Sequence, residues 1–426
     1  MRSTIIGCLL ILVLTGCLHG YTPTPTNPLP VASKTPTLIQ TVTPTVTSTP
    51  THVVDTNRVE HRCLQTDQTL MPKLNGRIVL SSEKENETSY LLDLQSGNKI
   101  DLGHTKDEVV SPDGSKLAYY DIDLGTIVVA DADGKKLKES LNLEKQLTPA
   151  HWLDNQRLMI NKDLNGLYQF LDSLVILNPL TGEQQEWLPD YPQQDSKRFY
   201  YWKVRSTLIP NPALTHLIYP IYEDGNTIAL WNIQSKREVA RIYGSDMVNT
   251  PWWSPDGTQF VTAALPMFTY GNKTYTNIDD GMPYIDGSEL FLVSITGEIR
   301  RLTYFSIREA ARQNGYTWSP DGKQIAFWEL NPLGDKTTHN WIPELVIVGV
   351  ETGDVTNYCR MAALTTTRFG FIIWPPPPVW SLDNRYLVVN QVDEELHYKV
   401  FLVDLQTAHA WQIAENVSAY GWMGEP

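Results

Sequence analysis

The pattern of apolar and polar positions after residue 57 is that of short β-strands separated by turns. Runs rich in Val, Ile, Leu, Phe and Tyr recur along this region, for example at 126–130, 227–231 and 344–348. Gly, Asp, Asn and Pro separate these runs, which is the spacing expected of strands joined by tight turns. The high aromatic content also favours sheets packed face to face. We therefore expect residues 57–426 to form an all-β domain.

One phrase recurs within this pattern. Ser-Pro-Asp-Gly follows Val110, Trp253 and Trp318, and the variant Ser-Leu-Asp-Asn follows Trp380. Pro fixes φ in a turn, Asp accepts hydrogen bonds from the following amides, and Gly tolerates positive φ, so the phrase predicts a turn between strands. The preceding Trp suits wedging between neighbouring sheets. We assign structural rather than catalytic roles to the repeat residues Asp113, Trp253, Asp256, Trp318, Asp321, Trp380, Asp383 and Trp422.

The repeat predicts a β-propeller. Each phrase is followed by a second apolar run, a short turn and a closing strand, which gives four strands per unit, and the shortest units are about 40 to 45 residues apart, as in propeller blades. Unit starts lie near residues 75, 111, 152, 211, 254, 319 and 381. These starts indicate seven blades, and the weak copies near 152 and 211 leave six or eight open. The first unit lacks its opening strand, whereas the chain ends with an unpaired one containing Trp422, so we expect these two halves to close the ring.

The Trp-Ser-Pro-Asp-Gly unit resembles the WD40-like repeat of TolB-type β-propellers, which is also seen in the propeller domains of prolyl oligopeptidases. The resemblance covers nearly all of residues 70–426. That family includes envelope scaffolds that bind proteins and non-catalytic gates in front of hydrolases, so the resemblance implies a binding platform more than a reaction. A prolyl oligopeptidase would need a hydrolase domain, and the sequence has no Gly-x-Ser-x-Gly, P-loop or Gly-x-Gly-x-x-Gly motif.

The N-terminal residues indicate export and lipidation. Residues 1–16 contain an apolar run that is too short to span a bilayer and has the order of a signal peptide. The segment ending in Gly16-Cys17 resembles the lipobox of bacterial lipoproteins, which implies cleavage before Cys17 and acylation of Cys17. The alternative is an ordinary secretory signal. Acyl chains on Cys17 would anchor the protein outside the cytoplasm, to the bacterial cell membrane or outer membrane.

Residues 17–56 predict a stalk between this anchor and the propeller. Between Thr22 and Thr51 there are 11 Thr and 7 Pro residues, and Lys34 is the one charged residue. Such a segment has too few apolar residues for a core and favours extended polyproline II structure. The organisation we expect is therefore a signal peptide at 1–16, a lipidated stalk at 17–56 and a propeller at 57–426.

The net charge makes nucleic acid an unlikely partner. The 48 acidic and 34 basic residues give a net charge of −14, the wrong sign for binding nucleic acid. We expect a monomer without a cofactor.

Once Cys8 leaves with the signal and Cys17 is lipidated, Cys63 and Cys359 remain, either as one disulfide or as two buried thiols.

No metal site is indicated by the histidines, which show neither His-x-His nor His-Glu-x-x-His spacing. A weaker candidate is the acidic segment containing Asp279, Asp280 and Asp286, whose oxygens suit Ca²⁺. The spacing is not that of an EF-hand, and Asp-Gly pairs commonly form turns, so we favour turns here.

Long inserts fall on one predicted face of the propeller. In a four-stranded blade, the connections between strands two and three and those between blades share a face, and all the long inserts are of these two kinds: 189–204, 265–288, 304–316, 330–343 and 360–378. Long loops in compact domains commonly carry function. Their aromatic residues are candidates for a binding face, or for small cores beneath the loops: Tyr200, Tyr201, Trp202, Phe268, Tyr270, Tyr275, Tyr284, Trp341, Phe371 and Trp374.

These observations favour a non-catalytic cell-envelope lipoprotein that binds another protein through its long-loop face. This hypothesis predicts an exposed apolar and aromatic patch on that face. The alternative is a carbohydrate-binding or carbohydrate-active propeller, which predicts coplanar aromatic rings and a pair of convergent carboxylates.

Overall fold

A computed structural model describes most of the region after residue 56. The described residues are 57–66, 71–82, 88–138, 147–162, 174–187, 190, 192, 208–221, 227–245, 251–282, 284, 286–307, 311–332, 341–360, 376–392 and 398–425. The predicted signal peptide, Cys17 and the stalk lie outside these ranges. Within them, helix is confined to a 3-10 turn at Phe305–Ile307. No helix in the described part of the chain has the length and hydropathy needed to span a membrane.

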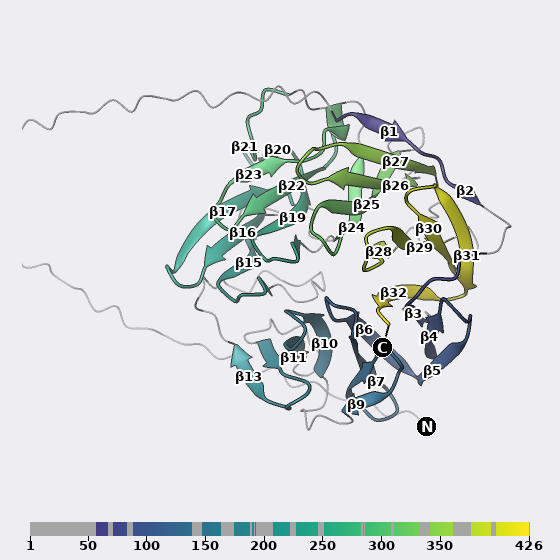
Figure 1. The fold of residues 1–426 in the computed structure, drawn as a ribbon. Helices are drawn as coiled ribbons and strands as arrows, with labels where there is room; N and C mark the ends of the chain where they lie inside the picture. Colours follow the sequence, from purple (N-terminus) through teal and green to yellow (C-terminus); the bar gives the residue numbers. More distant parts are fainter. Residues whose placement is uncertain are drawn as a thin grey trace, which may run out of the picture. The chain divides into compact units, whose positions relative to one another are not determined.

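Seven sheets, each built on four antiparallel strands, confirm the predicted seven-bladed β-propeller (Figure 1). Blade 1 consists of β32 (Ser418–Met423), β3 (Arg77–Ser81), β4 (Ser89–Asp93) and β5 (Lys99–Gly103). Blade 2 consists of β6 (Thr105–Val110), β7 (Lys116–Asp121), β8 (Thr126–Asp131) and β9 (Lys136–Lys138). Blade 3 consists of β10 (Leu147–Trp152), β11 (Leu158–Lys162), β12 (Leu174–Leu177) and β13 (Gln184–Trp187). Blade 4 consists of β14 (Ile209–Pro210), β15 (His216–Ile221), β16 (Thr227–Asn232) and β17 (Arg237–Tyr243).

The other three blades carry the additions to this plan. Blade 5 consists of β18 (Trp252–Trp253), β19 (Gln259–Ala264), β22 (Glu289–Ser294) and β23 (Ile299–Arg301), and its insert forms a separate hairpin of β20 (Met267–Tyr270) and β21 (Lys273–Thr276). Blade 6 consists of β24 (Arg312–Trp318), β25 (Gln324–Pro332), β26 (Trp341–Gly349) and β27 (Val355–Arg360). Blade 7 consists of β28 (Val379–Trp380), β29 (Tyr386–Val392), β30 (Tyr398–Asp404) and β31 (His409–Glu415).

The two ends of the propeller sequence meet in blade 1, as predicted. Strand β32 pairs antiparallel with β3, and Trp422 lies opposite Ile78. In blade 5, Trp253 lies opposite Phe260 at the corresponding register. The C-terminal strand therefore supplies the missing inner strand of the first unit, and the ring has no unpaired gap between its ends.

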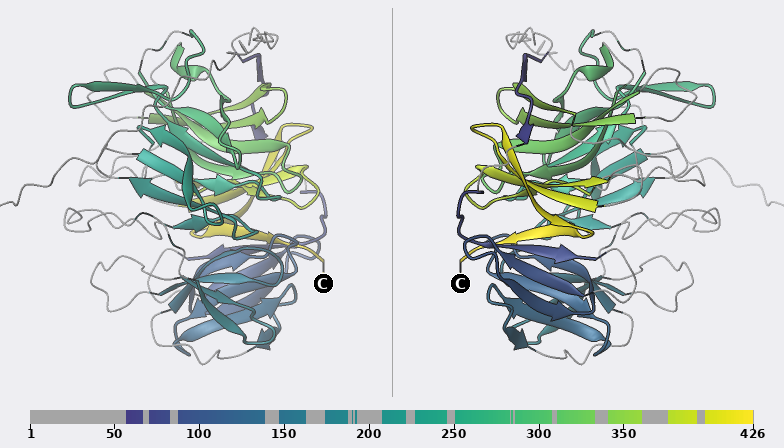
Figure 2. Two further views of the ribbon diagram at one scale, coloured as in Figure 1. Left: turned by 90° about the vertical axis from the view of Figure 1, so that its left-hand side faces the viewer. Right: turned by 90° about the vertical axis from the view of Figure 1, so that its right-hand side faces the viewer.

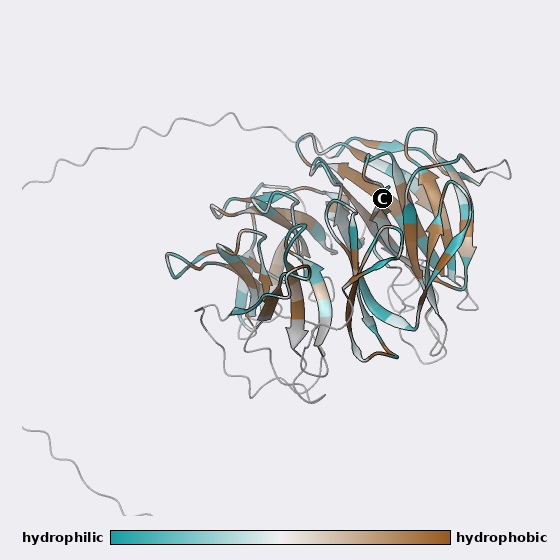
Figure 3. Cartoon of the chain, turned by 60° about the horizontal axis from the view of Figure 1, so that its bottom comes forward, coloured by the Kyte–Doolittle hydropathy of each residue, from teal (hydrophilic) through white to brown (hydrophobic). Residues whose placement is uncertain are grey.

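Each pair of neighbouring blades encloses its own apolar core. Ile78 and Leu80 belong to the core shared with blade 7, whereas Val79 between them belongs to the core shared with blade 2. Seven such clusters connect the seven blades in sequence. Because both faces of a blade are covered, its middle strands are apolar at successive positions, and hydrophobic residues lie along the strands of the blades (Figure 3).

The repeat tryptophans link adjacent blades through hydrogen bonds as well as packing. In four blades the indole N–H donates to a backbone carbonyl on the inner strand of the preceding blade. The pairs are Trp152 to Val109 at 3.0 Å, Trp253 to Ile209 at 3.1 Å, Trp318 to Trp252 at 3.0 Å and Trp380 to Thr317 at 3.3 Å. The amphipathic ring thus satisfies its one polar atom while its body fills the seam.

The Ser-Pro-Asp-Gly phrase forms the predicted turn between the first two strands of a blade. In blade 5, Asp256 Oδ1 accepts hydrogen bonds from Ser254 Oγ at 2.6 Å and from the Thr258 amide at 3.1 Å. Gly257 adopts a φ of 68°, which glycine tolerates without strain. In the Ser-Leu-Asp-Asn copy, Asn384 takes the same conformation with a φ of 61°. In all four copies of the phrase, the Asp carboxylate accepts a hydrogen bond from the Ser hydroxyl two residues before it.

The weak copies keep their turns with other side chains. Asp154 Oδ1 accepts the amides of Gln156 and Arg157, each at 2.8 Å. In blade 4, Asn211 Oδ1 accepts the amides of Thr215 at 2.8 Å and of His216 at 2.9 Å. These substitutes explain why seven blades form although two copies have lost the phrase.

The segment that enters the propeller makes blades 6 and 7 five-stranded, which the four-stranded repeat did not predict. Strand β1 (Val59–His61) pairs parallel with β27, and β2 (Gln65–Thr66) pairs parallel with β31. A disulfide joins Cys63 to Cys359, with their Cα atoms 4.8 Å apart. The bridged alternative is therefore the one present in the structure.

Candidate binding surface

The described part of the insert at 265–288 projects from the face that sequence analysis assigned to the long loops. It connects the second and third strands of blade 5 and contains the β20–β21 hairpin. Figure 2 shows this green hairpin extending away from the side on which the C-terminus lies. The opposite face carries the short Ser-Pro-Asp-Gly turns, whose polar groups are occupied by one another.

One face of the hairpin is aromatic. Phe268 lies opposite Tyr275, and Tyr270 lies opposite Lys273, so these four side chains share a face. The Phe268 ring is nearly parallel to that of Tyr270, with centroids 6.3 Å apart and planes inclined by 12°. Phe268 and Tyr275 are half-buried, whereas Tyr270 is 49% exposed. Met267, on the other face of the hairpin, is 45% exposed.

The half-buried rings pack on the edge of blade 4. Tyr275 stacks on Tyr243, the last residue of β17, with centroids 4.3 Å apart. Phe268 lies over Gly244, where a Cβ atom would come within 2.9 Å of the phenyl ring. Two of the predicted binding-face residues thus form a small core beneath the insert, as the alternative interpretation proposed, while Tyr270 is left for contact with solvent or a partner.

A single asparagine fastens the base of the hairpin. Asn277 Nδ2 donates to the carbonyls of Tyr243 at 2.8 Å and Leu265 at 2.6 Å, and Asn277 Oδ1 accepts the Tyr243 amide at 2.8 Å. The Leu265 amide in turn donates to the Gly244 carbonyl at 3.1 Å. The hairpin therefore bridges blades 4 and 5, which holds the exposed Tyr270 on a fixed support.

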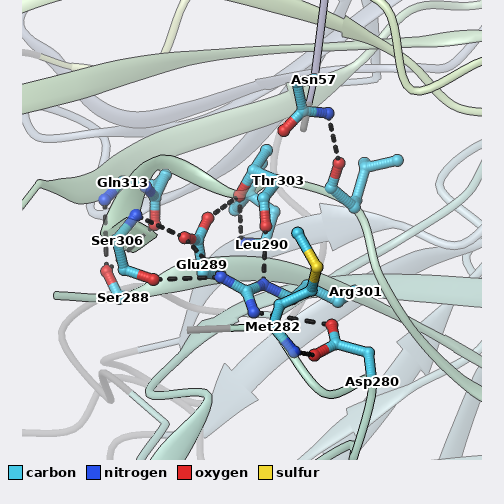
Figure 4. A network of polar contacts seen from close by, with 11 residues as sticks. Asn57, Asp280, Met282, Ser288, Glu289, Leu290, Arg301, Thr303, Ser306 and Gln313 are labelled. Carbon is cyan, nitrogen blue, oxygen red and sulfur yellow. Dashed lines mark hydrogen bonds and ion pairs between the residues drawn. The ribbon is translucent and has the colours of Figure 1, made fainter. Parts of the chain in front are cut away.

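The second half of the insert leads into a buried ion pair. Glu289 and Arg301, at the ends of β22 and β23, have side chains that are 0% and 1% exposed, and their charged groups are 3.1 Å apart (Figure 4). Glu289 also accepts hydrogen bonds from the Thr303 hydroxyl and from the Ser306 amide. Such a pair is stable when its remaining hydrogen-bonding positions are filled, as they are here.

The acidic segment is joined to this network. Asp280 Oδ2 lies 3.5 Å from an Arg301 guanidinium nitrogen, and Asp280 Oδ1 accepts the Met282 amide at 2.9 Å. No cluster of three or more metal-binding side chains occurs among the described residues. Asp279, Asp280 and Asp286 are thus not gathered into a set of Ca²⁺ ligands, and Asp280 contributes to the anchor of the insert.

The other candidate aromatics divide into two groups. Tyr284 is half-buried, and burial together with the nearby Asp286 raises the pKa of its phenol. Trp341 begins β26 opposite Pro332, so the predicted insert at 330–343 is partly strand. The remaining candidates lie outside the described residues: Tyr200, Tyr201, Trp202, Phe371 and Trp374.

A polar hollow of about 580 Å³ lies where blades 7 and 1 meet, on the same face as the hairpin. Its lining residues include Asp101, Glu415 and Tyr90. The Lys99 ammonium lies 4.2 Å from the centre of that ring. The sequence did not predict this hollow, because the residues that line it belong to no recognisable motif.

No protein-family model and no curated protein matches the sequence.

The chain is similar in structure to TolB and to other β-propellers. TolB from Acinetobacter baumannii is 12% identical with a TM-score of 0.40, and the match covers 82% of this chain and 66% of that one. The β-propeller domain of Cps50 (Swd1) from Myceliophteria thermophila is 12% identical with a TM-score of 0.41, covering 80% and 96%. An oligogalacturonate lyase from Vibrio parahaemolyticus is 14% identical with a TM-score of 0.44, covering 79% and 85%. At these identities the similarity concerns the fold alone, and the blade count rests on the strand order.

Proposed function

We propose that this propeller is a non-catalytic platform that binds another protein on the face bearing the β20–β21 hairpin. The observation that carries the proposal is the exposure of Tyr270 and Met267, on opposite faces of a hairpin whose base is fixed to two blades. Tyr and Met are enriched at protein interfaces, and a support that is already ordered lowers the entropy lost on binding.

The proposal includes attachment to the bacterial envelope through acylated Cys17. The lipobox-like sequence and the Thr/Pro-rich stalk support it. The Cys63–Cys359 disulfide also supports a site outside the cytoplasm, because such bonds persist mainly in oxidising compartments.

Carbohydrate binding is the second candidate function. The nearly parallel rings of Phe268 and Tyr270 suit stacking on a sugar, and the residues that line the hollow between blades 7 and 1 include two acidic residues as well as hydroxyl-bearing ones. We place this second because Phe268 is half-buried and the Lys99 ammonium lies over the Tyr90 ring.

A binding experiment with matched variants separates the two candidates. Full-length protein in detergent would be used to capture partners from solubilised envelope, and a captured protein would then be purified and its affinity measured directly. Tyr270→Ser combined with Met267→Ser should weaken that binding at least roughly tenfold, the loss typical of interface anchors.

The control is Leu180→Ser, which alters a 50% exposed apolar residue in a turn of the opposite face and should leave binding unchanged. Equal losses in both variants would contradict a hairpin-centred site. Retention of defined oligosaccharides, abolished by the hairpin variant and unaccompanied by any protein, would replace the protein-binding proposal with the carbohydrate one.

A further inference from the structure

The chain enters the propeller along the rim rather than directly into blade 1. We call residues 57–66 the strap. Its first strand, β1, lies on the outer edge of blade 6 and its second, β2, on the outer edge of blade 7 (Figure 1). The strap therefore crosses two blades before the chain reaches β3, where the ring closes.

The beginning of the strap also contacts blade 5. Asn57 Nδ2 donates to the Leu302 carbonyl, just after the outer strand of blade 5, at 3.1 Å. The same group donates to the Gly353 carbonyl in blade 6 at 2.7 Å. Asn57 is buried, so these two hydrogen bonds hold the seam between blades 5 and 6.

Apart from Asn57 and the disulfide, the strap is held mainly by backbone hydrogen bonds to β27 and β31, for example from the Arg62 amide to the Asn357 carbonyl at 2.9 Å. Val59 and Leu64 are only partly buried against the neighbouring cores, and the other strap residues are exposed. Segments with few buried apolar contacts open with small free energies, well below that of global unfolding. The Cys63–Cys359 bond is the one covalent cross-link between the described strap and the blades, and it adds to these weaker contacts.

The disulfide is within reach of a reductant. Cys63 is exposed and Cys359 is half-buried. Exposed disulfides are the ones most readily attacked by external thiols. We propose that the strap is a thiol-sensitive clamp across the seams of blades 5, 6 and 7, locked by the Cys63–Cys359 bond and released when that bond is reduced.

The release step needs an external dithiol as the reductant. One thiolate attacks Cys63 Sγ, forms a mixed disulfide with it and expels Cys359 as a thiolate, which then takes up a proton. The second thiol attacks the mixed disulfide and expels Cys63, which is protonated in the same way. Two electrons pass from the dithiol, which becomes a disulfide, to the two cysteines of the protein.

Hydrogen exchange of the full-length protein, followed by mass spectrometry with and without dithiothreitol, tests the clamp. Reduction should speed exchange of the amides at 58–66, and of their partners in β27 and β31, by roughly tenfold or more. Exchange in β13, the outer strand of blade 3, should stay as it was. Limited proteolysis should then cut the strap first and leave the seven blades intact.

The control is the double variant Cys63→Ser with Cys359→Ser, which should show rapid strap exchange that dithiothreitol does not alter. Two results would overturn the proposal. Strap amides that stay protected after reduction would mean that pairing alone holds the strap. A uniform rise in exchange across all blades, or loss of the whole fold on reduction, would mean that the bond supports the propeller globally.

Discussion

At the scale of single residues, the buried ion pair of Glu289 and Arg301 is the feature of the candidate surface that we expect to tolerate substitution least. Both side chains are almost fully buried, and Arg301 also joins Asp280 and Ser306 to the pair. A charge left without its partner at such depth is costly, whereas the intact pair adds little by itself. The pair therefore fixes the conformation of the insert more than it adds to stability.

Glu289→Gln should lower the free energy of unfolding by about 3 to 5 kcal/mol, because Arg301 would lose its buried counter-charge and keep only Asp280, which is partly exposed and 3.5 Å away. Urea unfolding followed by tryptophan fluorescence measures this. The exposed pair Lys236 and Asp190, with side chains 66% and 72% exposed, is the control, and Lys236→Ala should cost less than about 1 kcal/mol. Similar losses in the two variants would show that burial does not determine how much an ion pair contributes to the free energy of unfolding.

Histidine titration gives a second prediction at this scale. Burial lowers the pKa of His151, on the inner strand of blade 3, to about 4. An unfolded chain holds this proton more tightly, with a pKa of about 6.5, so stability is fully present above that value and declines as the pH falls towards 4. His151→Leu should flatten the fall in melting temperature between these pH values, and His61→Leu, at an exposed position of β1, should not. A pH profile that His151→Leu leaves unaltered would exclude this residue as the cause.

At the scale of elements, some residues of the insert hold the hairpin to the blades, whereas others are exposed and available to a partner. Asn277 bonds to three backbone groups of Tyr243 and Leu265, whereas Tyr270 lies at the exposed end. The sequence indicated an aromatic insert but not which of its aromatic residues are packed and which are exposed. Strands of four residues are too short for the alternation of side chains to show which rings contact blade 4.

Asn277→Ala should destabilise the protein by about 1 to 3 kcal/mol, since it removes three hydrogen bonds from partly buried backbone groups. Tyr270→Ser should change the melting temperature by less than about 2 °C, because an exposed side chain contributes little to stability. Differential scanning calorimetry of both variants tests the division. A larger loss for Tyr270→Ser than for Asn277→Ala would assign Tyr270 to support.

The strap shows the limit of sequence reasoning for elements. Blades were predictable because a turn phrase repeats and its Pro, Asp and Gly each have a local physical role. Strands β1 and β2 are short, mostly exposed and paired in parallel with partners far along the chain. Nothing local distinguishes them from coil, and the sequence left Cys63 and Cys359 as either thiols or a bridge.

At the scale of the whole molecule, closure depends on β32. Trp422→Ala should cost about 3 to 5 kcal/mol, because it removes a buried side chain from the core that joins blades 7 and 1. Tyr420→Ala on the same strand, at a residue 40% exposed, is the control and should cost less than about 1 kcal/mol. Chemical unfolding of both variants measures the difference. Equal values would mean that closure does not rest on the Trp422 seam.

Closure also sets the order of events during synthesis. Strand β32, which follows the other blades in the sequence, supplies the inner strand of blade 1, and the disulfide joins residues 296 positions apart. Pairings this distant form slowly, and a nascent chain lacks β32 until the strands of the other six blades have been made. The growing protein therefore passes through a stage in which six blades have all their strands while the first exposes an unpaired edge. A chain cut short before residue 418 would remain at that stage and present the edge to other chains.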